Sequence, residues 1–564
     1  MNISPPDRRG PAGDGGMPTD PYDRPGQTFP KLPPAMVERI SRYGEPASFD
    51  GGDYLFEVGD RGVDFFLILD GAVDILESDG RDGHVLIITH EPGEFTGELN
   101  HLTGRAVLVC ARAARPTRVI RVTRDAFRRM VSAEPDIGEI ILRAFILRRV
   151  GLIQHAEGGT VVLGSGHSAS ALRIQSFLTR NGYPHRVIDI DHDASAQQAL
   201  ESFHLGPGAL PVVILSGEQV LEHPTNRALA DALGITEELD PDHVYDVAVV
   251  GAGPAGLAAA VYAASEGLDT IVIEAVGPGG QAGSSSRIEN YLGFPTGISG
   301  QALAGRAQVQ AQKFGARLVV AKAATSLDCS GFPYRVSLDG TETIAARTIV
   351  VATGARYRRL DVPDLARFEG QGVHYAATSL EGRLCVDSEV VVVGGGNSAG
   401  QAAIFLSGKA SHVHILVRGE GLTDTMSDYL VRRIVESSAI TLHPRCEITA
   451  LIGEECLEAV RWREHGGAET ERQVSNLFQM IGAEPNSDWL SGCVALDDKG
   501  FVKTGYVHDD RVAVAQHATS IPGVFAVGDV RADSVKRVAS SVGEGSVVVH
   551  AIHGWLASLA AAAR

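Results

Sequence analysis

Hydrophobic and polar residues change their spacing along the chain, and each spacing predicts a different kind of domain. Residues 36–155 hold short segments of alternating character, such as Phe65 to Leu69 and Ala72 to Leu76. This pattern predicts an antiparallel β-roll, which a helix at Ile137 to Val150 closes. Residues 1–35 hold nine prolines, five glycines and almost no aliphatic residues, which predicts a disordered tail.

Residues 158–236 alternate apolar strands with helices. Strands are predicted at 161–163, 186–190 and 211–215, and helices at 169–180, 197–203 and 227–233. This order predicts a small α/β domain. From residue 244 onward the chain opens two βαβ units, at Val247 and Val390, which predicts one nucleotide-binding domain inserted within another.

Composition narrows the functional classes. Glycine makes up 65 of the 564 residues, and the net charge of −19 leaves no basic surface for nucleic acid. The most apolar stretch, near the C-terminus, is interrupted by Glu544, His550 and His553, so we expect no membrane partner. The six cysteines form neither a C-x-x-C pair nor a zinc-ligand spacing. We therefore expect a cytoplasmic protein with reduced thiols and no metal site.

The first βαβ opening carries a G-x-G-x-x-G loop between an apolar strand and an Ala-rich helix. Glycines at such a turn let backbone N–H groups and the helix N-terminus meet a pyrophosphate. Glu274 ends the next strand, where a carboxylate accepts hydrogen bonds from ribose hydroxyls. The loop residues assigned to FAD are Gly251, Gly253, Pro254, Ala255 and Gly256.

The second opening carries a G-x-G-x-x-A loop, and its residues assigned to a nicotinamide nucleotide are Gly394, Gly396, Asn397 and Ser398. Arg418 follows the next strand where NAD-binding chains have an acid. An arginine there can pair with a 2′-phosphate, so the sequence favours NADPH over NADH. The alternative is a solvated surface arginine.

Further motifs follow along the chain: Gly279-Gly280-Gln281, Ile288 to Tyr291, Ala352 to Ala355 and Val527-Gly528-Asp529. In this order, between residues 244 and 564, they resemble the motifs of low-molecular-weight thioredoxin reductases. They imply an FAD domain at 244–360 plus 485–564, an inserted NAD(P) domain at 361–484 that rotates on the crossing strands, and a homodimer. The motif residues implied to contact FAD are Gly280, Gln281, Asn290, Thr353, Gly354, Gly528, Asp529, Arg537, Val538 and Ala539.

The chain departs from this family where its redox cysteines would stand. Ala376 and Ser379 occupy the two sulfur positions of the family's C-A-T-C. Neither side chain can relay electrons through a disulfide. Cys385, the nearest cysteine, is assigned a packing role, with a reactive thiol as the alternative, and we name no catalytic residue. The altered Arg537-Val538-Ala539 and the lone Arg418 also differ from the family pattern.

The small α/β domain resembles the thioredoxin fold, with Pro211 in the place of its cis-proline. Its C-x-x-C position reads Gly166-His167-Ser168-Ala169-Ser170 and holds no sulfur, which favours a docking or spacer role over a hidden redox role.

Residues 40–150 resemble the cyclic-nucleotide-binding domain of Crp-type regulators. Glu98 would accept from the ribose and Arg105 would hold the phosphate, in a cassette shorter than the family's. Nucleotide binding and a purely structural β-roll both remain open. The cassette residues are Gly97, Glu98, Leu99, Arg105 and Ala106.

Together these patterns predict a multidomain protein: a β-roll, a thioredoxin-like α/β domain and two Rossmann-like domains, each an α/β three-layer sandwich. The leading hypothesis is an FAD-dependent oxidoreductase that takes hydride from NADPH or NADH and passes electrons to an unknown external acceptor. One alternative is a thioredoxin-disulfide reductase that acts through partner cysteines. The other is an FAD and cyclic-nucleotide sensor without turnover.

Overall fold

The computed structural model describes residues 20–562 apart from residues 79–83, 98–102, 156–158, 167, 192, 194–195, 197–199, 201–204, 216–218, 379, 423–425, 455, 468 and 508–515. The chain divides into two compact units, Met1–Gly159 and Thr160–Arg564. Each unit is described by itself below.

Unit 1 is an antiparallel β-roll closed by two helices. Its strands run in the order β1-β6-β3-β4, with β2 on β6 and β5 on β3. Phe65, Phe95, Phe127 and Phe145 are fully buried and pack ring against ring between the strands and the helices. The elements are β1 (Glu45–Phe49), β2 (Tyr54–Phe56), β3 (Phe65–Ser78), β4 (His84–His90), β5 (Phe95–Thr96), β6 (Cys110–Val122), α4 (Arg124–Ala133) and α5 (Pro135–Gln154).

The end of the expected tail is folded onto this unit instead of being disordered. Residues from 20 onward form η1 (Pro21–Asp23), α1 (Pro25–Thr28) and α2 (Pro34–Ser41). Two aromatic residues anchor the segment: Tyr22 stacks on His155 at 4.9 Å between ring centroids, and Phe29 lies 5.9 Å from His90. These anchors supply the apolar contacts that the prolines and glycines around them lack.

Unit 2 begins with a small α/β domain. Its sheet order is β10-β9-β7-β8, with β7 parallel to β8 and antiparallel to β9. The Leu210–Pro211 peptide bond is cis, as the resemblance implied. The helix expected at 197–203 lies mostly outside the described residues. The elements are β7 (Val161–Gly164), α6 (Ala169–Arg180), β8 (Arg186–Asp189), β9 (Val212–Leu215), β10 (Gln219–Glu222) and α8 (Asn226–Ala232).

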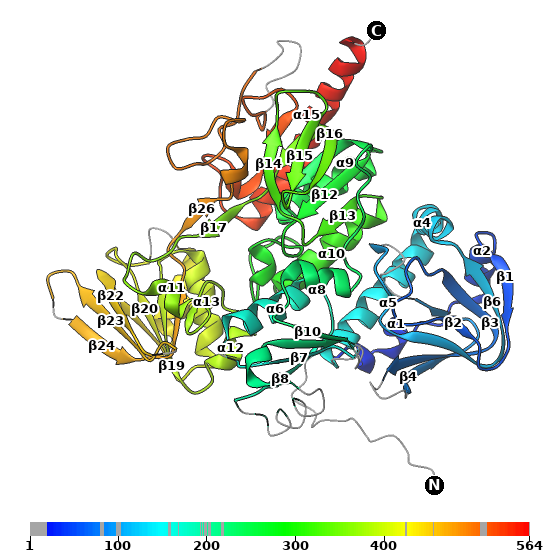
Figure 1. The fold of residues 1–564 in the computed structure, drawn as a ribbon, viewed down its shortest axis with the longest axis horizontal. Helices are drawn as coiled ribbons and strands as arrows, with labels where there is room; N and C mark the ends of the chain where they lie inside the picture. The colour runs from blue at the N-terminus through cyan, green and yellow to red at the C-terminus, as the bar shows by residue number, and fades with distance from the viewer. Residues whose placement is uncertain are drawn as a thin grey trace. The chain divides into compact units, whose positions relative to one another are not determined.

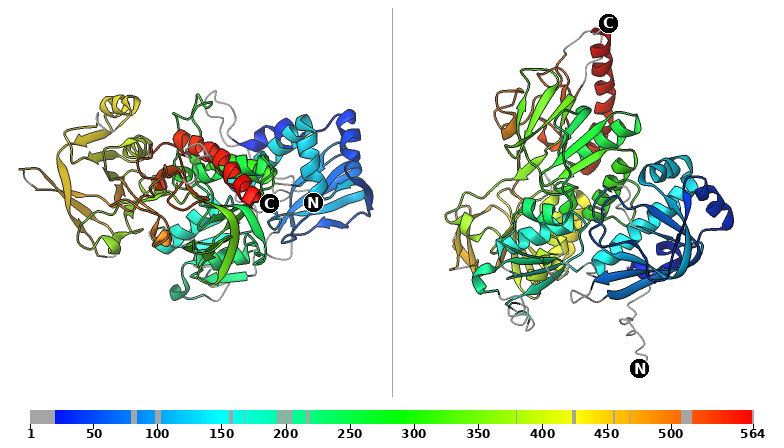
Figure 2. Two further views of the ribbon diagram at one scale, coloured as in Figure 1. Left: turned by 90° about the horizontal axis from the view of Figure 1, so that it is seen from above. Right: turned by 45° about the vertical axis from the view of Figure 1, so that its right-hand side comes forward.

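The FAD domain is a three-layer sandwich around a seven-stranded sheet, ordered β13-β12-β11-β16-β15-β14 with β27 on β16. Val247 and Val249 pack toward helices α9 and α15, while Ala248 and Val250 pack toward β15. Figures 1 and 2 show α15 lying along α9. The elements are β11 (Val244–Val250), α9 (Pro254–Ser265), β12 (Thr270–Glu274), η3 (Ala282–Ser284), α10 (Gly300–Lys313), β13 (Arg317–Val320), β14 (Ala324–Asp328), β15 (Tyr334–Leu338), β16 (Glu342–Val351), η4 (Asp488–Leu490), β27 (Val524–Ala526), η5 (Gly528–Val530) and α15 (Val538–Ala562).

Helix α15 is the apolar C-terminal stretch. Within the described part of the chain it alone is long and apolar enough, by length and composition, to cross a membrane. In the structure its Val548, Val549 and Ile552 are buried in the FAD-domain core. One face of α15 therefore packs into the core of this domain, against α9.

The inserted domain has a parallel sheet ordered β18-β25-β19-β20-β21, covered by the antiparallel sheet β22-β23-β24. It joins the FAD domain through a two-stranded ribbon, in which Tyr357 of β17 pairs with Ala483 of β26. The elements are β17 (Ala355–Tyr357), α11 (Leu365–Phe368), β18 (Val373–His374), α12 (Glu381–Leu384), β19 (Glu389–Val393), α13 (Asn397–Ser407), β20 (His412–Leu416), α14 (Asp428–Glu436), β21 (Ile440–His443), β22 (Cys446–Ile452), β23 (Ala459–Glu464), β24 (Glu469–Gln473), β25 (Asn476–Gln479) and β26 (Ala483–Pro485).

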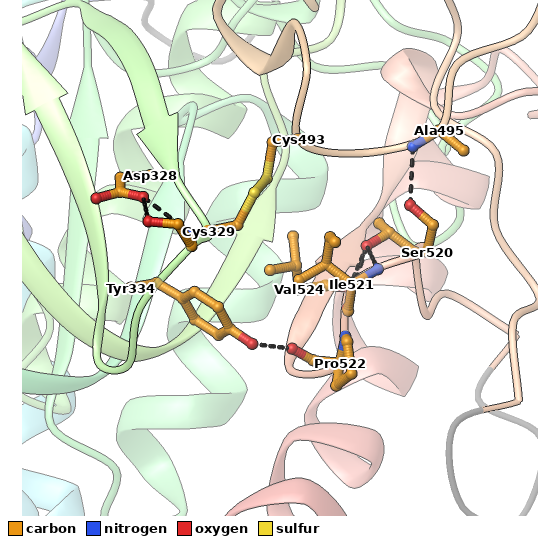
Figure 3. Close-up of a disulfide and its surroundings, with 11 residues drawn as sticks. Asp328, Cys329, Tyr334, Cys493, Ala495, Ser520, Ile521, Pro522 and Val524 are labelled. Atoms are coloured by element: carbon orange, nitrogen blue, oxygen red, sulfur yellow. Dashed lines mark hydrogen bonds between the residues drawn. A yellow bond between two sulfur atoms is a disulfide. The ribbon is translucent and has the colours of Figure 1, made fainter.

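The expectation that all thiols are reduced is wrong for one pair. Cys329 and Cys493 form a disulfide across 164 residues of sequence, with their Cα atoms 6.1 Å apart (Figure 3). The bridge joins the end of β14 to the segment after η4, beside Ile521 and Val524. The two cysteines meet only through the tertiary fold, so their sequence spacing carried no signal of the pairing.

Candidate functional site

The first glycine loop has the geometry that a dinucleotide requires. Gly251 has φ +107°, and a Cβ on it would overlap the carbonyl of Ala352. A Cβ on Gly256 would overlap the carbonyl oxygen of Gly251. Gly253 caps the N-terminus of α9, with Pro254 in the first turn and Ala255 buried behind it. Strand, turn and helix N-terminus are thus held together without side chains in the way, which fits a bound pyrophosphate.

Glu274 lies at the end of β12 and faces this loop. Its carboxylate accepts hydrogen bonds from the backbone N–H groups of Ala252 at 2.8 Å, Val276 at 3.0 Å and Gly277 at 3.2 Å. These bonds fix the carboxylate beside the glycine loop. Its position agrees with the predicted role toward the ribose of FAD.

The segment after Glu274 folds back over the glycine loop. The N–H of Gly279 donates to the carbonyl of Ala252 at 2.8 Å, and a Cβ on Gly280 would lie 3.0 Å from the Cα of Gly253. The Gln281 amide donates to the carbonyl of Ala355. Asn290, predicted on the same segment, is exposed. Gly280 therefore lies against the first glycine loop, Gln281 bonds to β17, and Asn290 is exposed. Their contacts with FAD stay predictions.

Thr353 and Gly354 lie between β16 and β17, where the chain leaves the FAD domain, and they bond to Asn486, where the chain returns to it. The Thr353 hydroxyl donates to the carbonyl of Asn486 at 2.6 Å, and the Asn486 amide donates to the carbonyl of Thr353 at 3.0 Å. The N–H of Asn486 also donates to the carbonyl of Gly354 at 3.0 Å. This reciprocal pair closes the two ends of the inserted domain beside the glycine loop.

Asp529 lies in η5, directly after β27. Burial raises the pKa of its carboxyl above the ordinary value, against the opposing effect of Lys536. Sequence reasoning missed the two residues that hold this turn: Glu544 of α15 accepts from the N–H of Gly528 at 2.7 Å and pairs with Arg531. A glutamate in an apolar helix is the signal that could have identified this capping role.

The Arg537 to Ala539 motif forms the start of α15. Arg537 and Ala539 are exposed, and the backbone N–H of Arg537 donates to the carbonyl of Val535 at 2.7 Å. These three residues follow the Asp529 turn in the sequence. Their predicted contact with FAD stays a prediction.

The second glycine loop repeats the geometry of the first. Gly394 has φ +137° and would overlap the carbonyl of Met480 if it carried a Cβ, and Gly396 caps α13. The Asn397 side chain accepts from the N–H of Ser427 at 2.7 Å. Arg418 is exposed just beyond β20, where a phosphate on a bound nucleotide could reach it. The loop fits a second dinucleotide.

Tyr357 lies on the ribbon that joins the FAD domain to the inserted domain. Its side chain is half-buried and packs against the core of the inserted domain. Burial raises the pKa of its phenol, and the charge of Asp529 raises it further.

The position of the family's redox cysteines holds no sulfur. Thr378 bonds through its N–H to Glu381 at 2.9 Å, and Ser379 lies outside the described residues. Cys385 is fully buried, and burial with the charge of Glu381 raises the pKa of its thiol to about 12. Its full burial in the core of the inserted domain agrees with the predicted packing role.

In unit 1, a cavity of about 50 Å³ lies inside the β-roll, next to the predicted cassette. Thr96 and Gly97 line it on the cassette side, and Tyr22, Phe29 and Arg148 on the other side. Glu98 and Leu99 lie outside the described residues, and Arg105 is not among the described residues that line the cavity.

Arg148 ties this cavity together. From the closing helix α5 its guanidinium donates to the carbonyls of Thr28 at 2.9 Å, Phe95 at 3.1 Å and Gly97 at 3.2 Å. One buried arginine thus joins the N-terminal segment, the cassette and the closing helix. Sequence reasoning missed it because the helix gave only an apolar pattern.

The sequence matches two known families. The pattern of the family described as "Pyridine nucleotide-disulphide oxidoreductase" matches residues 245–545, and that of the "Cyclic nucleotide-binding domain" matches residues 46–134. These two spans agree with the resemblances drawn from the motifs.

Relatives and solved structures agree with the first match. A thioredoxin reductase of Mycolicibacterium smegmatis is 34% identical over 315 residues, which are 56% of this chain and 97% of the relative. A thioredoxin reductase of Bacillus subtilis is 30% identical over 328 residues, which are 57% of this chain and 98% of the relative. The structure of Lactococcus lactis thioredoxin reductase in its FR conformation is 27% identical and superposes with a TM-score of 0.52, over 56% of this chain and 99% of that one.

Proposed function

The chain belongs to the pyridine nucleotide-disulphide oxidoreductase family, as a thioredoxin-reductase-like flavin oxidoreductase that uses FAD and NAD(P)H, and we propose that it delivers electrons to an acceptor outside the chain. When bound, FAD accepts hydride from the nicotinamide. In this proposal the first glycine loop binds FAD and the second binds the nicotinamide nucleotide. No side chain is needed as an acid or base for this transfer.

The observation that carries the proposal is the chemistry around residues 376–385. A disulfide relay needs two sulfurs, at least one of which becomes a thiolate. Ala376 has no sulfur, and Cys385 is buried with a pKa of about 12. The residues at the family's usual position therefore cannot form an internal disulfide relay.

The Cys329–Cys493 disulfide is proposed as structural and not as a substitute relay. It lies beside Val524, at the start of β27, whereas Asp529 follows the other end of that strand. At about 3.3 Å per residue, the three residues of β27 put roughly 10 Å between the bridge and the turn that holds Asp529. Thiol–disulfide exchange requires direct contact of the reacting groups.

Anaerobic titration with NADPH and with NADH tests this proposal. Without an internal relay, the protein takes up about two electrons per FAD, and a relay would add about two more. The Cys329→Ser/Cys493→Ser variant is the matched control and should give the same uptake. About four electrons in the native protein and two in this variant would contradict the proposal, as would flavin that neither nucleotide reduces.

The acceptor is then sought by multiple-turnover assays with a quinone, with oxygen and with a protein disulfide of the thioredoxin type. The names of the relatives favour the last class. Reduction of that disulfide with NADPH would identify the chain as a disulfide reductase that acts through its partner's cysteines. Turnover with none of the three acceptor classes would favour the sensor alternative.

For unit 1 we propose a cyclic-nucleotide effector, supported by the family match over residues 46–134 and by a cavity beside the cassette. A cavity of about 150 Å³ accommodates a single benzene ring. The present cavity of about 50 Å³ is smaller, so a nucleotide requires Tyr22 and Phe29 to move. Calorimetry with cyclic AMP and cyclic GMP on the full chain tests the binding, and the absence of heat with both would contradict it.

A further inference from the structure

The small α/β domain touches the FAD site through the C-terminal end of helix α6. The Arg180 guanidinium donates to the carbonyls of Gly277 and Gly280, both at 3.1 Å. The Asn181 amide donates to the carbonyl of Val276 at 2.9 Å. From the FAD side, the amide of Gln301 in α10 donates to the carbonyl of Thr179 at 2.7 Å. These hydrogen bonds join the C-terminal end of α6 to the 276–280 loop and to α10 of the FAD domain.

The carbonyls that receive these bonds belong to the loop that shapes the nucleotide site. The N–H groups of Val276 and Gly277 hold the carboxylate of Glu274. Gly280 packs against Gly253, in the first glycine loop. The small α/β domain therefore fixes one side of a loop whose other side forms the FAD site. Arg180 is a positioning residue for that loop.

The opposite end of α6 meets the inserted domain. A Cβ on Gly370 would overlap the Cβ of Ala169, and a Cβ on Gly166 would lie 3.6 Å from Cδ2 of Leu384. The pKa of His185 is lowered by burial and, to a smaller extent, by the charge of Arg383. A helix of twelve residues is about 18 Å long, so α6 spans from one nucleotide-binding domain to the other (Figure 1).

An ion pair also joins the two nucleotide-binding domains directly. Arg433 of α14, in the inserted domain, pairs with Glu289 of the FAD domain at 2.6 Å between Nη1 and Oε2. Glu289 lies on the segment that follows the flavin loop. With α6 and the ribbon, this pair makes a third connection between the two domains.

We propose that the small α/β domain is a clamp that prevents the rotation expected from the resemblance. Through α6 it holds the flavin loop at Arg180 and the inserted domain at Gly166 and Ala169, and it keeps both nucleotide-binding domains in one orientation throughout turnover. This inference rests on the proposed function. Without a dithiol at 376 and 379, turnover does not require the inserted domain to bring that segment to the flavin. Gly166 and Ala169, at the predicted C-x-x-C position, are thereby used for docking.

A cross-link tests whether the inserted domain stays in place. The Gly166→Cys/Leu384→Cys variant is joined by a short bis-maleimide with a cleavable disulfide spacer, and mass spectrometry identifies the product. We expect the cross-link to form in high yield. We expect the linked protein to reduce ferricyanide with NADPH within twofold of the unlinked protein. The two single variants, treated in the same way, are the controls.

Two results would overturn the clamp: failure of the cross-link to form, or a tenfold or larger loss of turnover that is recovered when the spacer is cleaved. Failure of NADPH to reduce the flavin before any cross-linking would instead contradict the proposed function. The two ideas can therefore fail separately.

The flavin end of the clamp is tested by FAD retention. We expect Arg180→Ala to raise the FAD dissociation constant about tenfold, measured by flavin fluorescence during reconstitution, and Arg180→Lys to recover part of the loss. Arg173→Ala is the matched control, since Arg173 lies on the same helix but bonds Pro224 and Asn226 within the small domain. An unchanged dissociation constant for Arg180→Ala, or an equal loss for Arg173→Ala, would overturn this part.

Discussion

The guanidinium of Arg531 pairs with the carboxylate of Glu544 across 2.7 Å, and the two side chains are only 13% and 14% exposed. The same carboxylate accepts from the N–H of Gly528, so it holds the turn that presents Asp529. Taking both charges out of water is costly, and the pair is stable only while both members are present. The flavin-side turn therefore depends on one glutamate in an otherwise apolar helix.

Glu544→Gln removes the charge and leaves Arg531 buried without its carboxylate. We expect the free energy of unfolding to fall by about 3 kcal/mol, and FAD to dissociate more readily because the Gly528 turn loosens. Urea unfolding and flavin release measure the two effects. Asp428→Asn breaks an ion pair with Arg432 whose members are 75% and 73% exposed, and should change stability by less than about 0.5 kcal/mol. Equal effects of the two variants would contradict the assignment.

The Cys329–Cys493 bridge closes a loop of 164 residues. Closing a loop of this size restricts the unfolded chain, so Cys329→Ser/Cys493→Ser should lower the free energy of unfolding by about 2–5 kcal/mol. Fluorescence of Trp489, close to the bridge, follows the transition. The rate of flavin reduction by NADPH should stay the same. A slower rate in this variant, but not in Cys456→Ser, would give the bridge a part in electron transfer.

His90 gives unit 1 a dependence on pH. Burial, and to a smaller extent the charge of Arg148, lowers its pKa to about 4 from an ordinary 6.5, although Glu94 opposes the shift. Between these pH values the unfolded chain binds a proton that the folded chain does not. The stability of unit 1 therefore falls as the pH drops from 6.5 to 4, by up to about 3 kcal/mol.

His90→Gln keeps a polar side chain next to Glu94 but does not titrate. We expect it to remove most of the acid-side loss, measured by hydrogen exchange of β3 and β6 peptides after correction for the intrinsic effect of pH. His84→Gln, on the exposed end of the same strand, is the control and should keep the loss. The assignment to His90 is wrong if its variant and the His84 variant follow the same pH curve.

Phe29 covers the β-roll cavity and lies under the guanidinium of Arg148, at 5.4 Å from the ring centroid. Phe29→Ala should make it easier for the N-terminal segment to move aside. We expect about tenfold tighter binding of the cyclic nucleotide, or about 1.4 kcal/mol, in calorimetry on the full chain. Phe49→Ala removes an aromatic ring from the same unit, outside the described lining of the cavity, and should leave affinity unchanged. Unaltered affinity in Phe29→Ala would mean that the segment does not obstruct the site.

The sequence was informative where a function depends on neighbouring residues. Each glycine loop lies within about thirty residues of its strand, its helix and the side chain that follows the second strand. Residues that are close in the sequence therefore determine its geometry. The cis peptide before Pro211 and the burial of Cys385 also agree with the predictions.

The contacts that the sequence did not reveal join residues far apart. Cys329 meets Cys493, Arg180 meets Gly280, and Arg148 meets Thr28 only because intervening strands and helices pack as they do. The N-terminal segment was misjudged because proline content outweighed Tyr22 and Phe29, whose aromatic rings suffice to anchor it. Composition averages over a segment, whereas packing can depend on one or two large side chains.

The ribbon of β17 and β26 has a consequence for modularity. Because Tyr357 and Ala483 are direct partners on antiparallel strands, the chain leaves the FAD domain and re-enters it at almost the same point. A short turn could replace everything between them, and the FAD domain would keep every strand of its own sheet. The inserted domain could therefore be exchanged, in evolution or by design, without changing the order or connections of the strands in the FAD-domain sheet.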